Sequence, residues 1–195
     1  MNLAVILGST RPGRAGERVA HWVQGRLALQ PGVTAELLDL REFSLPFLDE
    51  EKLPSQIRGG EYKSEAANRW FESISEMDGF VIVTPEYNHG YPAVLKNALD
   101  YLAQPWADKP VAFVSYSSGA VGGARVVEQL RQVVANLKLV AISEALHLGK
   151  VKELLDDSGA LLNEGPFDGL LDSELAQLVE WAALMKGKRE GNAGS

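Results

Sequence analysis

The chain of 195 residues contains no cysteine. This absence excludes disulfide bonds, thiolate metal sites, iron–sulfur clusters and a cysteine nucleophile. Redox chemistry must therefore use a cofactor, and the composition fits a reducing compartment. His21 and His147 lie far apart in the sequence and lack a surrounding pattern of carboxylates, so we expect no metal site.

Long apolar runs and a positive charge balance are also missing. No apolar run approaches the roughly 20 residues that span a bilayer, and the start of the chain lacks the basic segment of a signal peptide. We therefore expect a cytoplasmic protein without a membrane partner. The formal net charge of −7 argues against nucleic acid as a partner.

The length and a hydrophobic content of 46% fit one globular domain with a substantial core. We expect residues 1–190 to form that domain and residues 191–195 to be a frayed tail. Residues 41–60, which contain two prolines and a glycine pair, predict a long surface loop.

Hydrophobic periodicity predicts strands that alternate with helices along the chain. This alternation predicts an α/β fold, a three-layer, doubly wound, five-stranded parallel sheet. In the flavodoxin-like strand order 2-1-3-4-5, the loops after strands one, three and four are neighbours, and the switch point lies between strands one and three. The expected strands are an apolar run from Ala4 and residues 33–40, 80–84, 111–115 and 139–146; the expected helices are residues 15–29, 63–77, 92–103, 124–136 and 168–186.

The loop after the first strand is rich in groups that bind phosphate. Ser9 and Thr10 offer hydroxyls, and Gly13 lets backbone N–H groups approach a ligand. Arg11 and Arg14 offer forked cationic donors, and the next helix adds its positive N-terminus. The alternative is that these arginines are ordinary solvent-exposed residues at the start of a helix and bind no ligand.

Two common phosphate-binding motifs are absent. No Gly-Lys-Ser or Gly-Lys-Thr occurs, which argues against a nucleoside triphosphate. The glycine spacing does not match the Gly-x-Gly-x-x-Gly of dinucleotide sites. A terminal monophosphate, held as a handle, is the ligand group that remains.

The loop after the third strand, residues 84–92, has features of a binding loop. Pro85 and Pro92 stiffen it, Tyr87 offers an aromatic face, and Asn88 can donate and accept hydrogen bonds. Such a loop can hold a flat heteroaromatic ring, although an ordinary loop before a helix is an alternative. Small residues at 115–123 follow the fourth strand and could serve only close packing of strand and helix.

These motifs resemble the NADPH-dependent FMN reductase family, which includes flavodoxin-like NAD(P)H:quinone, chromate and azo reductases. The resemblance rests on Gly8-Ser-Thr-Arg11, on Pro85-Glu-Tyr-Asn88 and on Leu95-Lys-Asn97, and it covers Asn2 to Leu148. It implies FMN as cofactor and NADPH or NADH as co-substrate. In a ping-pong cycle, hydride would pass through FMN to a flavin, quinone, azo compound or similar acceptor, with no side chain acting as a catalytic group.

The resemblance also implies a homodimer or homotetramer, with the helix from Pro92 to Leu102 and the segment around Trp106 as candidate surfaces. It further implies which residues bind FMN. The residues expected at the phosphate are Ser9, Arg11, Gly13, Arg14 and Gly16; those expected at the ring are Pro85, Glu86, Tyr87 and Asn88 on one side and Ser115, Tyr116, Ser117 and Gly119 on the other.

Two other functions fit parts of the pattern. A flavodoxin-type electron carrier would bind the same cofactor without oxidising NAD(P)H itself, although its phosphate loop usually lacks an arginine such as Arg11. A nucleotide- or phosphosugar-binding enzyme could use the same first loop.

Overall fold

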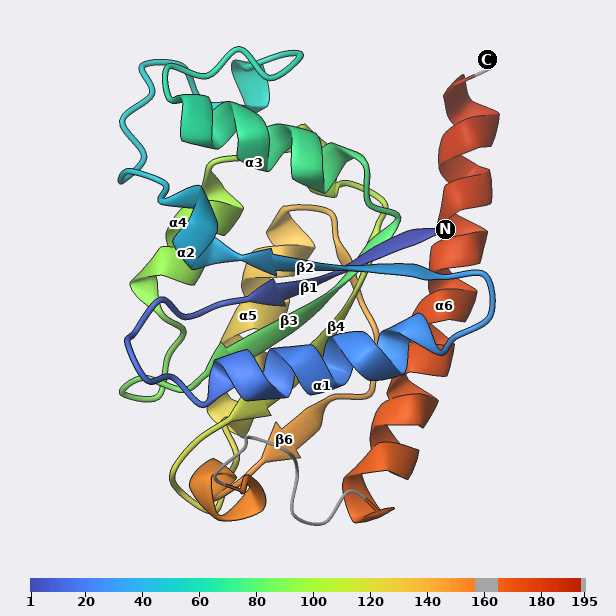
Figure 1. Ribbon diagram of the computed structural model, residues 1–195. Coiled ribbons are helices and arrows are strands. Elements are labelled where there is room, and N and C mark those ends of the chain that lie inside the picture. The colour runs from blue at the N-terminus through green and yellow to red at the C-terminus, as the bar shows by residue number, and fades with distance from the viewer. Residues whose placement is uncertain (157–164, 194–195) are drawn as a thin grey trace.

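The computed structural model describes residues 1–156 and 165–193. Its centre is a parallel sheet in the order β2-β1-β3-β4-β5 (Figure 1), which confirms the predicted flavodoxin-like order. The principal strands are β1 (Asn2–Leu7), β2 (Thr34–Asp39), β3 (Gly79–Pro85) and β4 (Pro110–Tyr116).

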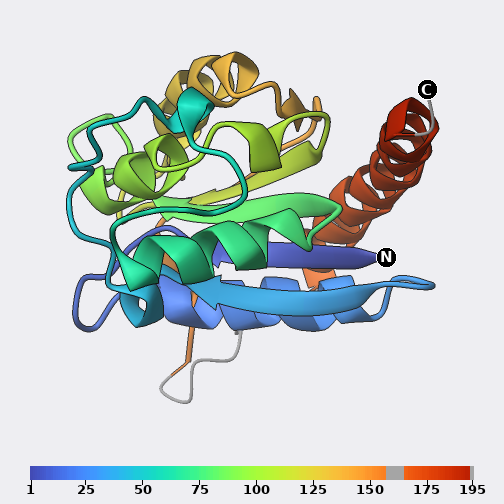
Figure 2. The same ribbon diagram turned by 90° about the horizontal axis from the view of Figure 1, so that it is seen from above.

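Helices cover both faces of this sheet, as Figures 1 and 2 show from two directions. Alternate residues of β1, β3 and β4 pack against α1 and α6 on one face, and the others pack against α3, α4 and α5. The helices are α1 (Gly16–Ala28), α2 (Leu40–Phe43), α3 (Glu65–Ser75), α4 (Ala93–Asp100), α5 (Ala124–Asn136) and α6 (Gly165–Ala193).

The central strands are apolar because both of their faces are covered. In β1, Leu3 and Val5 point to the α1 and α6 side, whereas Ala4 and Ile6 point to the opposite side, and all four are fully buried. A continuous apolar run is typical of such doubly covered strands.

The predicted fifth strand at residues 139–146 is wrong in its extent. Two short strands, β5 (Val140–Ala141) and β6 (Leu146–Leu148), occupy its place, and each pairs in parallel with a different part of β4. Between them, Arg131 of α5 donates to the carbonyls of Ile142 and Ser143 at 2.7 and 2.9 Å. These two carbonyls therefore bond to a helix side chain, whereas the Ile142 amide still donates to the Val111 carbonyl of β4 at 3.0 Å.

A buried carboxyl group from α6 fills the gap in the pairing. Glu174 is 2% exposed, and its Oε1 accepts a hydrogen bond from the amide of Phe113 in β4 at 3.1 Å. Burial raises the pKa of Glu174 to about 8. Hydrogen bonds from the Phe113 and Leu146 amides lower the pKa but do not outweigh burial; of the nearby charges, Glu144 raises it and Arg131 lowers it. Glu174 is therefore largely protonated in the folded protein at neutral pH.

This raised pKa predicts a pH-dependent stability. The unfolded chain ionises Glu174 near its ordinary pKa, whereas the folded chain keeps the proton up to about pH 8. The free energy of unfolding should therefore fall as pH rises from about 4.5 to 8, by up to about 1.4 kcal/mol per pH unit. In Glu174→Gln this part of the decline should be absent, as urea unfolding of the flavin-free protein at a series of pH values can show. Parallel pH profiles for both proteins would contradict the assignment.

Two further expectations about the periphery need correction. The segment 41–60, expected to be a loop throughout, contains regular structure. Helix α2 ends within its first residues, and a 3-10 helix at Pro54–Gln56 lies near its end. The last helix, expected over residues 168–186, is longer and runs from Gly165 to Ala193, and residues 194–195 lie outside the described part. Arg189 and Lys186 of α6 bind Asp78 at 2.8 and 3.0 Å, and these ion pairs hold the end of the helix on the sheet.

Trp106 does not lie at an exposed edge. It is fully buried, donates from Nε1 to the carbonyl of Leu99 at 3.1 Å, and packs edge-on against Phe80 with 5.1 Å between the ring centroids. It is therefore a core residue and not part of a docking surface. Among the helices of the described ranges, none is both long and apolar enough to cross a membrane.

Candidate functional site

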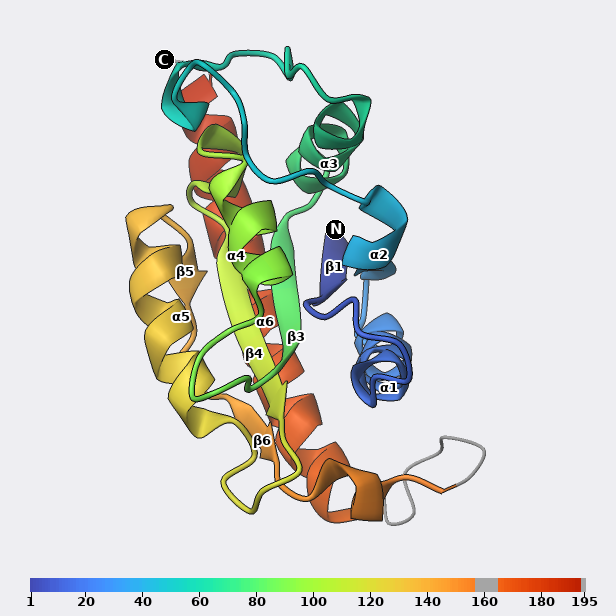
Figure 3. The ribbon, with the colours of Figure 1, turned by 90° about the vertical axis from the view of Figure 1, so that its left-hand side faces the viewer.

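Three loops meet at the carboxyl edge of the sheet, which Figure 3 faces. They follow β1, β3 and β4, and the strand order reverses between β1 and β3. Ligands of open α/β sheets bind at such a switch point. A cavity of about 210 Å³ lies here, lined by Arg11, Arg14 and Ala15 from the first loop, residues 85–87 from the second and residues 116–118 from the third.

A second, larger hollow adjoins this cavity. It measures about 590 Å³, runs along the outer side of α1, and shares Arg14, Ala15 and Lys152 with the first. The smaller cavity alone lies below the roughly 300 Å³ at which small-molecule sites begin. A ligand of cofactor size would therefore extend from the cavity toward the larger hollow.

The first loop presents free hydrogen-bond donors. Arg11 is exposed, and its guanidinium has no acidic partner among the described residues. Gly13 has φ +66°, a left-handed conformation that glycine adopts without strain. Helix α1 begins after Ala15 without a side-chain cap, so its first amides stay available to an anion.

Arg14 does not offer its charge to a ligand in this structure. Its side chain is 1% exposed and forms a two-pronged ion pair with Asp39 at the end of β2. It also donates to the carbonyl of Ser9. Arg14 therefore acts as a strut between the first loop and β2 in this structure, and its expected phosphate contact stays a prediction. Arg41 supports the same loop from outside by donating to the carbonyls of Thr10 and Arg11 at 3.3 and 3.1 Å.

Ser9 connects the first loop to the second. It is 1% exposed, and its Oγ lies 2.7 Å from the hydroxyl of Tyr87. Tyr87 is 38% exposed and lines the cavity. The hydrogen bond fixes the Tyr87 ring as one wall of the cavity.

Gly16 is required by the close approach of α1 to β4. A Cβ at this position would lie 2.1 Å from the hydroxyl oxygen of Tyr116. Tyr116 is buried and lines the cavity, and burial raises its pKa well above the usual range. Its hydroxyl therefore stays protonated at neutral pH.

The second loop contains a tight two-residue turn. Tyr87 and Gly90 exchange backbone hydrogen bonds of 2.9 Å in both directions. Asn88 and His89, between them, are exposed and left-handed, with φ of 50° and 69°. Gln129 of α5 donates to the carbonyl of His89 at 2.8 Å and holds the turn in place.

Glu86 is fixed by a charged partner from α5. Arg125 Nε donates to its Oε1 at 2.8 Å. Burial by itself raises the pKa of Glu86, but the hydrogen bond and charge of Arg125 outweigh it, so the pKa is lowered. Glu86 Oε2 is buried without a hydrogen-bond partner among the described residues, which leaves an acceptor for a ligand in the cavity wall.

The third loop divides into a buried part and a cavity-lining part. Ser115 is fully buried, with its Oγ 2.8 Å from the Gly122 carbonyl and 2.7 Å from His147 Nδ1. It serves the close packing that small residues permit. Ser117 lines the cavity, and the carbonyl of Gly119 accepts from the amide of Lys150 at 3.0 Å.

A model of the family described as NADPH-dependent FMN reductase matches residues 1–153. The chain belongs to the NADPH-dependent FMN reductase family. An NAD(P)H-dependent FMN reductase of Schizosaccharomyces pombe is 34% identical over 187 residues, which cover 84% of this chain and 92% of that protein. A quinone reductase of Escherichia coli K12 is 30% identical over 178 residues, which cover 87% and 89% of the two chains.

The structural comparison agrees with this membership. The flavoenzyme FerB of Paracoccus denitrificans, an NAD(P)H:(acceptor) oxidoreductase, superposes with a TM-score of 0.72. The match has 25% sequence identity and covers 94% of this chain and 98% of FerB. The residues 1–153 that match the family model include all three loops that line the cavity.

Several residues at the site were not singled out by the sequence. Arg41 supports the first loop and Arg125 holds Glu86, whereas Val151 and Lys152 complete the cavity wall. Arg125 stands in the first turn of the helix after the glycine-rich loop, which is a recognisable position. The others come from segments whose approach to the site depends on the tertiary fold. Within the described ranges, no group of metal-ligating side chains is present.

Proposed function

We propose that this protein is an oxidoreductase that binds FMN and oxidises NAD(P)H to reduce a small-molecule acceptor such as a quinone or a flavin. The observation that supports it most directly is the cavity at the switch point, which a free arginine of the first loop and the aromatic second loop line together. Family membership and relatives named FMN reductase and quinone reductase support the same reaction class.

The cavity has the groups that FMN requires. Arg11 and the uncapped start of α1 would hold the phosphate. Residues 85–87 and Ser117 would border the ring, and the unpartnered Glu86 Oε2 offers an acceptor. Bound FMN supplies reversible hydride chemistry between NAD(P)H and the acceptor, which we propose proceeds by a ping-pong cycle.

The chain's own residues would bind and orient the reactants. The Ser9–Tyr87 hydrogen bond holds the aromatic wall, and the Arg125–Glu86 pair holds the strand end beside it. Tyr116 keeps its proton and closes the floor against α1. We assign no side chain a nucleophilic or proton-transfer role.

Replacing Arg11 with alanine tests the site. The loss of a charge-assisted contact to phosphate should raise the Kd for FMN by about 10-fold to 100-fold, as a fluorescence titration can measure. Turnover should recover when FMN is saturating. Arg69→Ala, which removes an exposed arginine paired with Glu65 on α3, is the matched control and should bind FMN normally. An unchanged Kd in Arg11→Ala would remove this residue from the site.

A flavodoxin-type carrier is the alternative that the fold alone would also permit. The visible spectrum of the FMN-loaded protein separates the two functions. Bleaching of the flavin by NADPH or NADH supports the reductase. A flavin that stays oxidised with both would support the carrier.

We also propose that the protein forms a homodimer or homotetramer through the exposed side of α4. Phe47 is 80% exposed and lines, with Ala93 and Val94, a hollow of about 280 Å³. An exposed apolar surface of this kind is typical of an interface. Light scattering should show more than one copy in the wild type and a shift toward monomer in Phe47→Asp; a monomeric wild type would contradict the proposal.

A further inference from the structure

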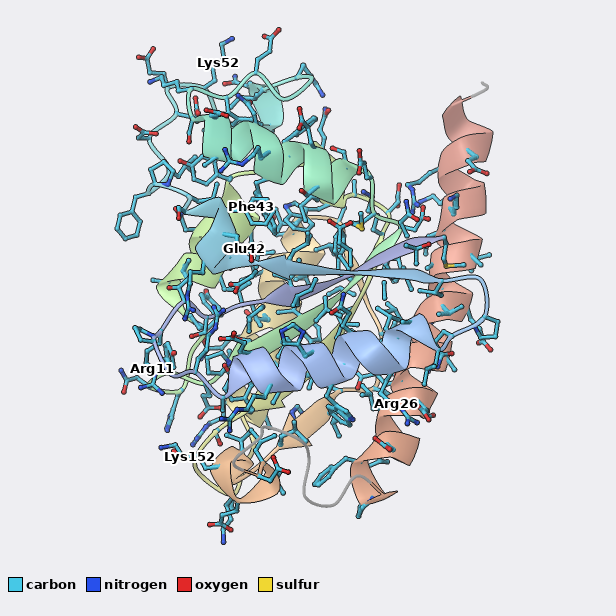
Figure 4. The ribbon with its side chains drawn as sticks, viewed as in Figure 1. Arg11, Arg26, Glu42, Phe43, Lys52 and Lys152 are labelled. Atoms are coloured by element: carbon cyan, nitrogen blue, oxygen red, sulfur yellow. The ribbon has the colours of Figure 1, made fainter. Side chains whose placement is uncertain are left out.

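Two cations from distant parts of the chain line the same cavity. Arg11 belongs to the loop after β1, and Lys152 belongs to the 3-10 helix Val151–Leu154 that follows β6. Figure 4 shows both at the left-hand edge of the molecule near the start of α1, with Lys152 below Arg11. An anion at the start of this helix would therefore lie between them.

The backbone that carries Lys152 is tied to the third loop. The amide of Val151 donates to the carbonyl of Ser117, and the amide of Lys150 donates to that of Gly119, each at 3.0 Å. Val151 itself is 4% exposed. Lys152 is thus presented to the cavity from a fixed turn.

Among the described residues, no carboxylate pairs with Lys152. Other cations around the site are neutralised or bonded, as Arg14 is by Asp39 and Arg125 is by Glu86. Lys152 and Arg11 have no acidic partner in the part of the chain that the structure describes. A phosphomonoester carries about −1.5 to −2 charges at neutral pH, so a single arginine leaves it incompletely compensated.

Acidic groups limit where such an anion can lie. Beyond the shared wall, two acidic residues, Glu17 and Asp156, and one arginine, Arg18, line the larger hollow, whereas Lys152 stands on the wall that the two hollows share. The electrostatics therefore favour the shared wall, close to Arg11, over the interior of the larger hollow.

We propose that Lys152 binds a phosphomonoester at this shared wall, opposite Arg11. This inference rests on the proposed function, which offers two sources of the group: the 5′-phosphate of FMN and the 2′-phosphate of NADPH. Lys152 is then a ligand-binding residue in a segment outside the first loop.

The test compares Lys152→Gln with Lys150→Gln. Lys150 is also an exposed lysine, two positions earlier, but it pairs with Glu153 at 3.5 Å and lies outside both cavity walls. If the phosphate is that of FMN, Lys152→Gln should raise the Kd for FMN about 5-fold to 20-fold and leave the Kd for riboflavin unchanged. If it is that of NADPH, kcat/KM with saturating FMN should fall for NADPH and not for NADH.

A third measurement separates this inference from the proposed function. Inorganic phosphate should raise the melting temperature of the flavin-free wild type and of Lys150→Gln more than that of Lys152→Gln. This result would support the phosphate site even if the wild type bound no flavin. If Lys152→Gln matched Lys150→Gln in the flavin, co-substrate and phosphate measurements, the inference would be overturned.

Discussion

Asp39→Asn should lower the free energy of unfolding by about 3–5 kcal/mol, because it leaves the buried Arg14 guanidinium with only the half-exposed Glu17, 3.6 Å from its Nε, as a counter-charge. Only 1% of the Arg14 side chain is exposed, and 15% of Asp39. Asp39 also accepts from the amide of Arg41 at 2.9 Å at the start of α2. Urea unfolding of the flavin-free protein measures the loss.

The control for this effect is an ion pair on the surface. Asp108 pairs with Lys188, and their side chains are 40% and 52% exposed. Asp108→Asn should therefore cost less than about 1 kcal/mol. Equal losses in the two variants would show that the Arg14–Asp39 pair is no stronger than a solvated one. Because Arg14 also holds the Ser9 carbonyl, Asp39→Asn should weaken FMN binding as well.

Gly16→Ala should both destabilise the protein and prevent normal flavin binding. The new methyl group would lie 2.1 Å from Tyr116 Oη, so either α1 or the Tyr116 ring must shift. Overpacking of this kind costs about 1–3 kcal/mol. Since the start of α1 and Tyr116 both border the proposed FMN site, we expect the Kd for FMN to rise at least about 10-fold. Thermal unfolding and a flavin titration measure the two effects.

A second glycine of α1, Gly25, provides a control in which the change in stability should have the opposite sign. A Cβ at Gly25 meets no atom within 4 Å. Gly25→Ala should therefore stabilise α1 by up to about 1 kcal/mol and leave FMN affinity unchanged. In Gly16→Ala, the further change Tyr116→Phe should restore part of the stability, because it removes the atom in closest conflict. Normal flavin binding by Gly16→Ala alone would contradict the close packing described above.

The sequence predicted the features that depend on local pattern. Apolar runs such as Phe80–Thr84 located the central strands, and the helical spacing from Val126 to Val134 gave α5 with its observed bounds. The positions of the three loops followed from the parallel topology, and the structure brings Arg11, Tyr87 and Ser117 to one cavity.

Features that depend on distant partners could not be predicted. The sequence does not show that Arg14 pairs with Asp39, which lies at the end of another strand. Nor does it show that His147 of β6 approaches the hydroxyl of Ser115. The break in the fifth strand depends on Arg131 and Glu174, which come from helices on opposite faces of the sheet. None of these pairings leaves a periodic signal in the sequence.

The two short strands beside β4, β5 and β6, also affect whether molecules associate through the edge of the sheet. A long, flat edge strand exposes a row of unpaired backbone groups on which another chain can add. Here the edge of the sheet consists of the two-residue strand β5 and the three-residue strand β6, with the exposed Ser143 and Glu144 between them. With a net charge of −7 on the chain, this edge offers little template for β-sheet aggregation, and the break in the strand helps to keep the folded protein dispersed at high concentration.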